Sequence, residues 1–366
     1  MKIVVIGTRG IPKIMGGVET HCEELYPRIA AMDHDVTVIR RKSYVQEPKP
    51  LNEYKGVKLI DIYNPRSKSL EAIVHTFLAV LKARSLHPDV LHIHAIGPSM
   101  LAPVARLLGL KVVMTNHGPD YDRQKWGKAA KTVLKFSERM GTLFSHRVIV
   151  ISKVIADILR TKYGRDDTVL IYNGVNTPVK SQSREYLRGL GLKDTDKYIL
   201  AMGRFVKEKG FHDLVEAYSR IDKDKYPYRL VIAGDCDHPD HYSESLKDSA
   251  RKAGAVLTGF IKGEQLNQVM TNASLFVLPS YHEGLPIALL EAMSYNLDVL
   301  VSDIPANKLD CLLPADYFRT ADVDELAAAL ARKLDSPTPM RVYDLSPFNW
   351  DTIALQTSEL YKQLLC

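Results

Sequence analysis

The sequence predicts an α/β protein made of two doubly wound domains, each built on a parallel β-sheet. Short β-branched runs alternate with longer amphipathic segments along the whole chain. These runs are continuously apolar, which is typical of parallel strands that carry helices on both faces. At about 100–200 residues per domain, the 366 residues are enough for two domains.

Two series of candidate strands lie along the chain, separated by helical patterns. The first series is expected at Lys2–Gly7, Asp35–Arg40, Val57–Ile62, Val90–His94, Val112–Asn116, Arg147–Ser152 and Val169–Tyr172. The second is expected at Tyr198–Gly203, Arg229–Gly234, Ala255–Gly259, Leu275–Pro279 and Val299–Asp303. The spacing of the apolar residues at 211, 214, 215, 218 and 221 predicts one face of a helix between two of these strands.

The change from the first series to the second places the domain boundary just after Asn173-Gly174. We expect a first domain over residues 1–176, a second over 184–346 and a terminal segment over 347–366. The stretch between the domains carries Pro178 and two serines, which is typical of a linker. The terminal segment is predicted to be helical from about Trp350, and its pattern alone allows it to pack on either domain.

Composition and charge exclude several classes of protein. Hydrophobic residues make up 46% and charged residues 25%, which excludes global disorder. No apolar run approaches the roughly 18 residues of a membrane span, and Ile3–Ile6 is too short for a signal peptide. We therefore expect a cytoplasmic protein. The net charge of +6 is too small to predict a nucleic-acid partner.

The four cysteines are scattered and show no C-x-x-C spacing, which argues against a zinc ribbon, a redox motif or a disulfide framework. The segment Asp235–His241 holds many side chains that can bind metals, but its spacing matches no standard site. His92 and His94 share one face of a strand and are expected to lie in the core or to line a crevice. No metal site is therefore predicted.

Ligands of open parallel sheets bind beyond the carboxyl ends of the strands, so the residues that follow each strand matter most. In the second half, Leu275–Pro279 is followed by a loop that carries Glu283 and then by a helix from about Ile287 that carries Glu291. The start of a helix offers free N–H groups that suit a phosphate. Taken alone, Glu283 would be an acid at a helix start and Glu291 part of a solvated face.

A second loop of this kind is Gly203-Arg204-Phe205-Val206-Lys207-Glu208-Lys209-Gly210. Its glycines allow close approach of the backbone, and Arg204 and Lys209 supply two positive charges. Arginine can bind a phosphate through two hydrogen bonds, and lysine acts as a mobile charge. The alternative is an ordinary solvated loop, because basic loop residues are common.

In the first half of the chain, two further features also follow predicted strands. Gly16-Gly17 precedes a helix and can admit an anionic group, although neither G-x-G-x-x-G nor a P-loop motif is present. His117 follows Val112–Asn116 and is expected to point toward the crevice or to serve a structural role, with neither favoured.

In combination, these loops resemble the family 4 retaining glycosyltransferases, and the resemblance covers nearly the whole chain. It rests on Gly16-Gly17-Val18-Glu19, His117-Gly118, Asn173-Gly174-Val175, the Gly203–Gly210 loop, Glu283-Gly284-Leu285-Pro286 to Glu291, and the terminal helix at Trp350. The opening Ile6–Pro12 also resembles a subgroup that assembles bacterial surface polysaccharides, including rhamnosyltransferases.

The resemblance implies a GT-B fold, in which two Rossmann-like domains face a cleft. The second domain would bind a nucleotide-sugar donor, a UDP- or dTDP-sugar, and the first would bind the acceptor. The acceptor would be a glycan or a lipid-linked glycan, and the terminal helix would cross back to the first domain. Neither a cofactor nor a metal would be required.

The resemblance also implies roles for individual residues. Arg204 and Lys209 would bind the diphosphate and stabilise it as it leaves, and Glu283 and His117 would contact the donor sugar. The remaining substrate contacts would come from Gly16 and Gly17 at the phosphates, Gly203 through close backbone approach, Ile261 at the base, Leu285, Pro286 and Ile287 at the diphosphate, and Glu291 at the ribose.

Two other functions stay open. One is a nucleotide-sugar epimerase or a phosphorylase of the same fold, although nothing in the sequence supports the pyridoxal phosphate that a phosphorylase needs. The other is a non-catalytic module that binds a sugar nucleotide or a glycan, against which the four charged residues Arg204, Lys209, Glu283 and Glu291 argue.

The segment Arg123–Arg147 carries seven basic residues and one acid. Lys128, Lys131, Lys135 and Arg139 form one stripe of a predicted helix. This stripe could dock on an anionic membrane surface, where each charge contributes about 1 kcal/mol. It could equally be a solvated face above a stripe that faces the core.

Overall fold

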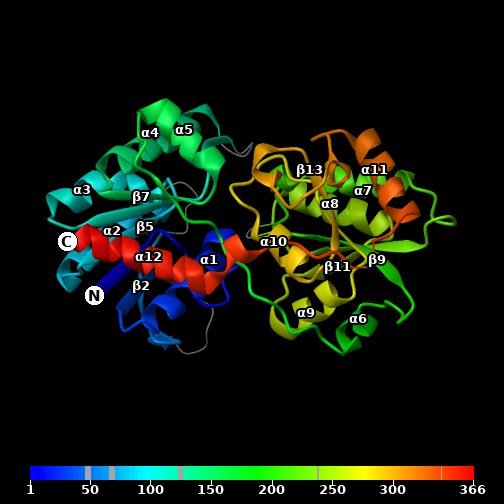
Figure 1. Ribbon diagram of the computed structural model, residues 1–366, viewed down its shortest axis with the longest axis horizontal. Coiled ribbons are helices and arrows are strands. Elements are labelled where there is room, and N and C mark those ends of the chain that lie inside the picture. Colours follow the sequence, from blue (N-terminus) through cyan, green and yellow to red (C-terminus); the bar gives the residue numbers. More distant parts are fainter. Residues whose placement is uncertain (46–50, 66–70, 123–126, 237–238, 339) are drawn as a thin grey trace. The chain divides into compact units, whose positions relative to one another are not determined.

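The computed structural model describes residues 1–45, 51–65, 71–122, 127–236, 239–338 and 340–366, and the chain divides into two compact units. Unit 1 consists of Met1–Gly174 together with Pro347–Cys366, and unit 2 consists of Val175–Ser346. Each unit contains its own parallel sheet with helices on both faces, as Figure 1 shows. The prediction of two doubly wound α/β domains is therefore confirmed.

The sheet of unit 1 has the strand order β3-β4-β2-β1-β5-β6-β7-β8 in the described part of the chain. The strands are β1 (Lys2–Ile6), β2 (Asp35–Arg41), β3 (Glu53–Tyr54), β4 (Val57–Ile62), β5 (Val90–His94), β6 (Val112–Asn116), β7 (Arg147–Val150) and β8 (Val169–Leu170). All neighbours pair in parallel except β3 and β4. The order of the strands reverses between β1 and β5.

Helices cover both faces of this sheet. They are α1 (Gly17–Ala30), α2 (Glu71–Leu86), α3 (Ala102–Leu107), α4 (Lys128–Phe144), α5 (Lys153–Tyr163) and α12 (Trp350–Leu365). One core joins α1 and α12 to the sheet, and a second joins α2 and α3 to the opposite face. Val4 and Val5 of β1 belong to different cores, because successive side chains of a strand point to opposite faces.

Unit 2 has the strand order β11-β10-β9-β12-β13-β14, with every neighbouring pair parallel. The strands are β9 (Lys197–Met202), β10 (Tyr228–Ala233), β11 (Val256–Gly259), β12 (Leu275–Leu278), β13 (Asp298–Ser302) and β14 (Tyr317–Phe318). The chain order is that of a Rossmann sheet, and it reverses between β9 and β12. A ligand site is therefore expected beyond the carboxyl ends of these two strands.

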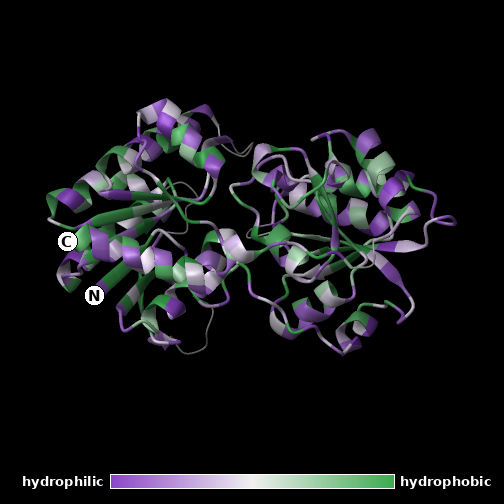
Figure 2. Ribbon diagram, in the orientation of Figure 1, coloured by the Kyte–Doolittle hydropathy of each residue, from purple (hydrophilic) through white to green (hydrophobic). Residues whose placement is uncertain are grey.

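The helices of unit 2 also form two layers. They are α6 (Glu185–Gly189), α7 (Phe211–Arg220), α8 (His241–Lys252), α9 (Gly263–Thr271), α10 (Ile287–Ser294) and α11 (Val323–Asp335). One core contains α7, α8 and α11, and the other contains α6, α9 and α10. Figure 2 shows the strands as hydrophobic and the outer faces of the helices as hydrophilic.

Each predicted strand occurs in the structure within two residues of its expected ends. The structure adds β3 and β14, each two residues long, which are too short to produce a periodic pattern. The predicted helix face at 211–221 is confirmed up to Arg220, and Ile221 follows the helix as its extended C-cap.

The terminal helix α12 packs on unit 1, against α1 (Figure 1). Its first residue, Trp350, lies against Gly174, where an added Cβ would be 2.4 Å from Trp350 Cδ2. Only a glycine leaves room for the indole there. Arg28 of α1 also pairs with Asp351, with Nε and Oδ1 2.9 Å apart.

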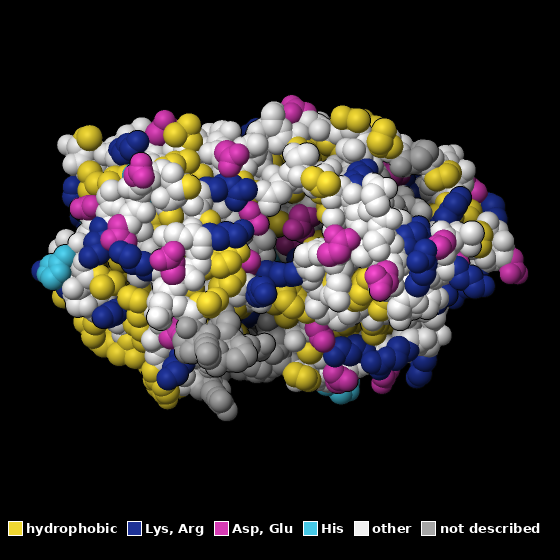
Figure 3. Space-filling model, turned by 90° about the horizontal axis from the view of Figure 1, so that it is seen from below, with side chains coloured by type: hydrophobic (Ala, Val, Ile, Leu, Met, Phe, Trp, Pro, Cys, Tyr) yellow, Lys and Arg dark blue, Asp and Glu magenta, His cyan; other side chains and the backbone are white. Residues whose placement is uncertain are grey.

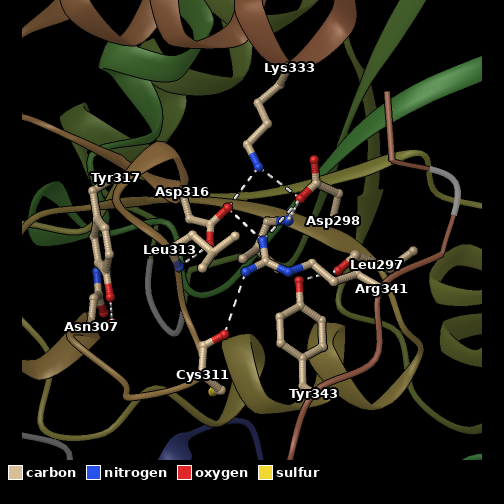
Figure 4. A network of polar contacts seen from close by, with 11 residues as sticks. Leu297, Asp298, Asn307, Cys311, Leu313, Asp316, Tyr317, Lys333, Arg341 and Tyr343 are labelled. Atoms are coloured by element: carbon tan, nitrogen blue, oxygen red, sulfur yellow. Dashed lines mark hydrogen bonds and ion pairs between the residues drawn. The ribbon is translucent and has the colours of Figure 1, made fainter. Parts of the chain in front are cut away.

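A buried ionic network ties the last segment of unit 2, which carries Arg341, to β13 and α11 of the same unit (Figure 4). Lys333 Nζ lies 2.8 Å from both Asp298 Oδ1 and Asp316 Oδ1, and Arg341 Nη1 lies 2.6 Å from Asp316 Oδ1. The two aspartates are 3% and 1% exposed, so the cations offset the cost of burying their carboxylates. The burial of Asp316 opposes its ionisation, but the hydrogen bonds of Arg341 and Lys333 hold its pKa below the ordinary value.

Within the described residues, none of the helices is both long and apolar enough to cross a bilayer. On the face displayed in Figure 3, basic and acidic side chains are interspersed over both units.

Candidate functional site

The loops that follow β9 and β12 meet at the point where the strand order of unit 2 reverses. They are neighbours because β9 and β12 pair directly, with Leu275 beside Ile199. Lys209 Nζ from the first loop lies 2.5 Å from Glu283 Oε1 of the second. Ser280 Oγ donates a hydrogen bond of 2.7 Å to the same oxygen. Residues 74 positions apart in the chain thus form one charged cluster.

Glu283 is held in its ionised form. Burial of the side chain, which is 11% exposed, disfavours the carboxylate. The charge and hydrogen bond of Lys209, with the hydrogen bond from Ser280, outweigh this effect and lower the pKa of Glu283. The contacts from Lys209 and Ser280 both fall on Oε1.

The backbones of the two loops are in close contact. Gly210 has φ +64°, and a Cβ there would lie 2.0 Å from the Pro279 carbonyl oxygen. The Tyr281 N–H donates to the Glu208 carbonyl oxygen over 2.8 Å. Gly234, which follows β10, makes a similar close contact with Gly203. A Cβ on Gly234 would lie 1.9 Å from the Gly203 carbonyl oxygen. The glycines noted in the sequence therefore permit close contact between strand ends.

The other predicted donor residues of unit 2 lie on the same two loops or beside them. Arg204 is half-buried in the loop after β9, and Glu291 is half-buried one turn into α10. Leu285 and Pro286 are buried before α10, and Ile287 is its first residue. Ile261 is 8% exposed and belongs to the core beneath α9 and α10.

A separate hollow of unit 2 lies near the amino ends of β9 and β10. Lys197, Lys225, Tyr228 and Asp335 are among the residues that line it. Because ligands of such sheets bind at the opposite, carboxyl ends, we do not assign this hollow to the donor.

In unit 1, Gly16 and Gly17 stand at the start of α1, and Gly16 caps it with φ 146°. A Cβ on Gly16 would lie 2.0 Å from Glu19 Oε2. The buried Glu19 carboxylate accepts hydrogen bonds from the Arg9 N–H at 3.0 Å and from Thr8 Oγ1 at 3.3 Å. This carboxylate fixes the loop after β1 against the first turn of α1.

His117 belongs to a cluster of four histidines at the carboxyl ends of β5 and β6. His117 Nε2 lies 2.9 Å from His94 Nδ1, and His94 Nε2 is hydrogen-bonded to the Tyr26 hydroxyl. His92 Nδ1 lies 2.9 Å from the same hydroxyl, and its ring is stacked on that of His94. A chain of polar contacts thus connects His117 with the interior of unit 1.

His21 of α1 completes this cluster. Its ring centre lies 5.0 Å from that of His117 and 5.5 Å from that of His94. His21 Nδ1 lies 2.9 Å from Asn173 Oδ1. Burial, followed by the nearby His117, lowers the pKa of His21 to about 3, and burial, followed by His92, does the same for His117. These rings are therefore neutral at physiological pH.

Sequence reasoning placed His92 and His94 in the core or a crevice, and both are fully buried. It gave no role in the site to His21, Asn173 or Ser280, although Asn173 was part of the motif at the domain boundary. The signal for Ser280 was its position immediately after β12, three residues before Glu283. The pairing of His21 with Asn173 gave no signal, because 152 positions separate them and only the fold brings them together.

Parts of two predicted features lie outside the described residues. In the 235–241 segment, which includes the undescribed residues 237 and 238, Asp235 Oδ1 pairs with Lys247 Nζ at 2.9 Å. Asp240 caps α8 by accepting from the Ser243 N–H. Residues 123–126 of the basic segment are likewise not described.

The rest of the basic segment forms α4, which exposes apolar and basic side chains side by side. Phe136 is 53% exposed, Val133 45% and Leu143 40%. Lys128, Lys135 and Arg139 are exposed on the same helix. Val133, Phe136 and Leu143 are thus not a core-facing stripe, whereas Leu134 of the same helix packs against a core cluster of unit 1.

Comparison with solved structures shows that the fold is that of a GT-B glycosyltransferase. The structure matches sucrose-phosphate synthase of Thermosynechococcus elongatus with a TM-score of 0.83, at 23% identity, over 99% of this chain and 98% of that chain. It also matches Anabaena HepE, solved with UDP and glucose, with a TM-score of 0.78 at 17% identity, over 99% and 100% of the two chains.

Family models match both units. The model "Glycosyltransferase Family 4" matches residues 15–178, and "Glycosyl transferases group 1" matches residues 182–342. The chain belongs to this family of glycosyltransferases.

Curated relatives agree with this assignment. An uncharacterized glycosyltransferase of Methanocaldococcus jannaschii is 25% identical over 99% of this chain and 98% of its own length. The putative teichuronic acid biosynthesis glycosyltransferase TuaC of Bacillus subtilis is 26% identical over 74% of this chain and 70% of its own length.

Proposed function

We propose that this glycosyltransferase moves a sugar from a UDP- or dTDP-sugar to an acceptor hydroxyl, with retention of anomeric configuration and without a metal ion. The observation that carries the proposal is the Lys209–Glu283–Ser280 cluster at the strand reversal of unit 2. The solved relative HepE binds UDP-glucose, which supports a nucleotide-sugar donor.

The chemistry of the proposed reaction fits the charges present. Cleavage of a sugar–diphosphate bond builds negative charge on the leaving oxygen. A unit charge pair at 4 Å contributes about 4 kcal/mol at an effective dielectric near 20. Lys209 and Arg204, together with the N–H groups at the start of α10, would therefore stabilise the leaving group by several kcal/mol. In the proposal these groups take the place of the metal clamp of other phosphate enzymes.

Glu283 has two tasks in this proposal. Through Oε1 it holds the Lys209 ammonium, and through Oε2 it accepts hydrogen bonds from hydroxyls of the donor sugar. Glu291 binds the ribose, Ile261 approaches the base, and His117 contacts the transferred sugar. Gly16, Gly17, Gly203, Leu285, Pro286 and Ile287 supply the close backbone contacts to the donor.

The reaction is tested by incubating the protein with UDP-glucose, UDP-galactose and dTDP-rhamnose and a panel of acceptors. Nuclear magnetic resonance of the product gives the configuration of the new bond, and inversion would contradict the proposed mechanism. Each donor is also incubated without acceptor. Conversion of the donor into its epimer would establish an epimerase, and binding without turnover by any acceptor would favour a non-catalytic module.

For the acceptor, we propose a lipid-linked or surface-polysaccharide glycan, reached by docking of α4 on an anionic membrane. The exposed basic and apolar side chains of α4 support this proposal, because both can enter a membrane interface together. The similarity to a putative teichuronic acid glycosyltransferase agrees with such an acceptor.

Membrane docking is tested by sedimentation with vesicles of phosphatidylglycerol or phosphatidylcholine. The double variant Lys128→Glu/Arg139→Glu should lose binding to the anionic vesicles, since each charge contributes about 1 kcal/mol there. The matched control is Arg251→Glu/Lys252→Glu on α8, which are exposed at the end of a helix in unit 2. Equal binding of both variants would contradict a role for α4.

A further inference from the structure

The histidine cluster of unit 1 contains three rings whose nitrogens converge. His21, His94 and His117 each offer one ring nitrogen, and these three atoms lie within 4.8 Å of one another. They come from α1, from the end of β5 and from the turn after β6. Imidazole nitrogen is the ligand that Zn²⁺, Co²⁺, Ni²⁺ and Cu²⁺ share.

An independent observation on His21 also supports a ligand at this cluster. His21 is 3% exposed, and among the described residues its Nε2 has no hydrogen-bond partner. The Asn173 carbonyl oxygen lies 2.9 Å from the other ring nitrogen, which must therefore carry the proton. The lone pair of Nε2 is left facing the interior. A metal-binding histidine has this arrangement, with its second nitrogen donating to a fixed acceptor.

His94 and His117 can adopt the same arrangement. Their nearest nitrogens, Nδ1 and Nε2, lie 2.9 Å apart and share one proton. A cation between them displaces this proton to the other nitrogen of the ring that carries it. A proton on His94 Nδ1 moves to His94 Nε2 and is donated to the Tyr26 hydroxyl, and a proton on His117 Nε2 moves to His117 Nδ1. The exchange leaves every ring neutral and needs no proton from solvent.

The distances require only small movements. Nitrogens bound to tetrahedral zinc at about 2.0–2.1 Å lie about 3.4 Å apart. The His94 and His117 nitrogens would separate by roughly 0.5 Å, and His21 would approach by less than about 1.5 Å. We propose that His21, His94 and His117 form a binding site for a borderline divalent cation such as Zn²⁺ or Co²⁺, with one position left open.

The proposed cation site is inhibitory rather than catalytic. A cation held by His117 removes this residue from the transferred sugar, so it should slow the transferase. This consequence rests on the proposed function, whereas binding of the cation does not. Binding and inhibition are therefore measured separately, and their failures can be told apart.

Trp350 provides the optical probe, because its indole lies 5.4 Å from the His21 ring. The chain has two tryptophans, so Trp126→Phe leaves Trp350 as the sole tryptophan, which is excited selectively over the tyrosines at long wavelength. Tag-free protein with this substitution is titrated with Co²⁺ while fluorescence and visible ligand-field absorbance are recorded. Both signals should saturate at one equivalent, and Zn²⁺ should reverse them.

His21→Gln and His117→Ala should each weaken Co²⁺ binding at least about tenfold. The control is His75→Gln, which alters another buried histidine with an unpartnered ring nitrogen and should leave Co²⁺ affinity unchanged. Melting curves establish that each variant is folded, and His117→Ala alone suffices if His21→Gln does not fold. Absence of saturable quenching, or equal affinity of a folded ligand variant and the control, would overturn the proposal.

Discussion

Lys209 Nζ and Glu283 Oε1 lie 2.5 Å apart, although the two side chains come from different loops of unit 2. Neither residue is fully buried, at 17% and 11% exposure, so a ligand at the strand ends can reach both. Lys209→Ala should lower kcat/KM about 10²–10³-fold, as the loss of one preorganised charge contact does. Nucleotide binding, measured by calorimetry with UDP and dTDP, should weaken as well.

The matched control for Lys209→Ala is Lys207→Ala, in the same turn but with an exposed side chain. It removes the same charge from the same loop without touching Glu283. Equal kinetics of the two variants would show that Lys209 acts only through the net charge of the loop. Wild-type kinetics of Lys209→Ala would exclude it from the donor site.

Glu283 should make the stability of unit 2 depend on pH. Burial of Glu283 raises the pKa of its carboxyl group. The charge and hydrogen bond of Lys209 and the hydrogen bond of Ser280 lower this pKa by a larger amount, so the folded-state pKa lies below the unfolded value of about 4.3. A group of this kind stabilises the fold above its unfolded pKa, and this contribution is lost as the pH falls through the folded pKa. Glu283→Gln should therefore flatten the acid side of the stability curve, measured by urea unfolding between about pH 3 and pH 6. An unchanged slope would contradict the ion pair.

The buried network of Figure 4 should contribute more to stability than any exposed ion pair. Arg341→Met leaves the Asp316 carboxylate, 1% exposed, with Lys333 as its remaining cation. Breaking a buried pair costs about 3–5 kcal/mol. Arg319→Met removes the exposed contact to Glu325 and should cost about 0–1 kcal/mol. Denaturant unfolding compares the two, and equal losses would show that the network adds nothing.

The junction of Gly174 and Trp350 should be intolerant of any side chain. Gly174→Ala places a Cβ 2.4 Å from Trp350 Cδ2, so α12 must shift. Such overpacking costs about 1–3 kcal/mol. Gly189→Ala is the control, because a Cβ there meets nothing within 4 Å. Melting temperature and protease sensitivity of the last helix should change only in Gly174→Ala, and an unshifted melting temperature would argue that α12 adapts.

The sequence predicted the parallel sheets because the pattern of a buried strand is local. Val112–Asn116, for instance, begins with three apolar residues in succession and matches β6. It also placed Lys209 and Glu283 in loops at the carboxyl ends of strands. Their direct contact was not predicted, because it depends on β9 and β12 being neighbours in the sheet. The apolar pattern of α12 left its packing side open, because the apolar face of a helix does not name its partner, and only the resemblance implied the first domain. The structure decides this through the fit of Trp350 on Gly174.

The histidine cluster is a second case in which local sequence patterns do not identify the packing partners. A strand places His92 and His94 on one face, and this local alternation was visible. The approach of His21 depends on where α1 crosses the sheet, and no pattern within α1 marks it. Ring nitrogens 23 to 96 positions apart in the chain meet only in the folded unit.

Chelation should leave the transferase active. Lys209 and Arg204 carry fixed positive charge on the donor loop, so the proposed mechanism needs no divalent cation at the diphosphate. Activity in excess EDTA should equal that in buffer, and added Mg²⁺ or Mn²⁺ should not raise it. Micromolar Zn²⁺ should lower activity in the wild type and in His75→Gln, through the histidine cluster of unit 1. Loss of activity in EDTA that only Mg²⁺ or Mn²⁺ restores would overturn the cationic mechanism, because two side-chain charges would then be insufficient to stabilise the leaving diphosphate.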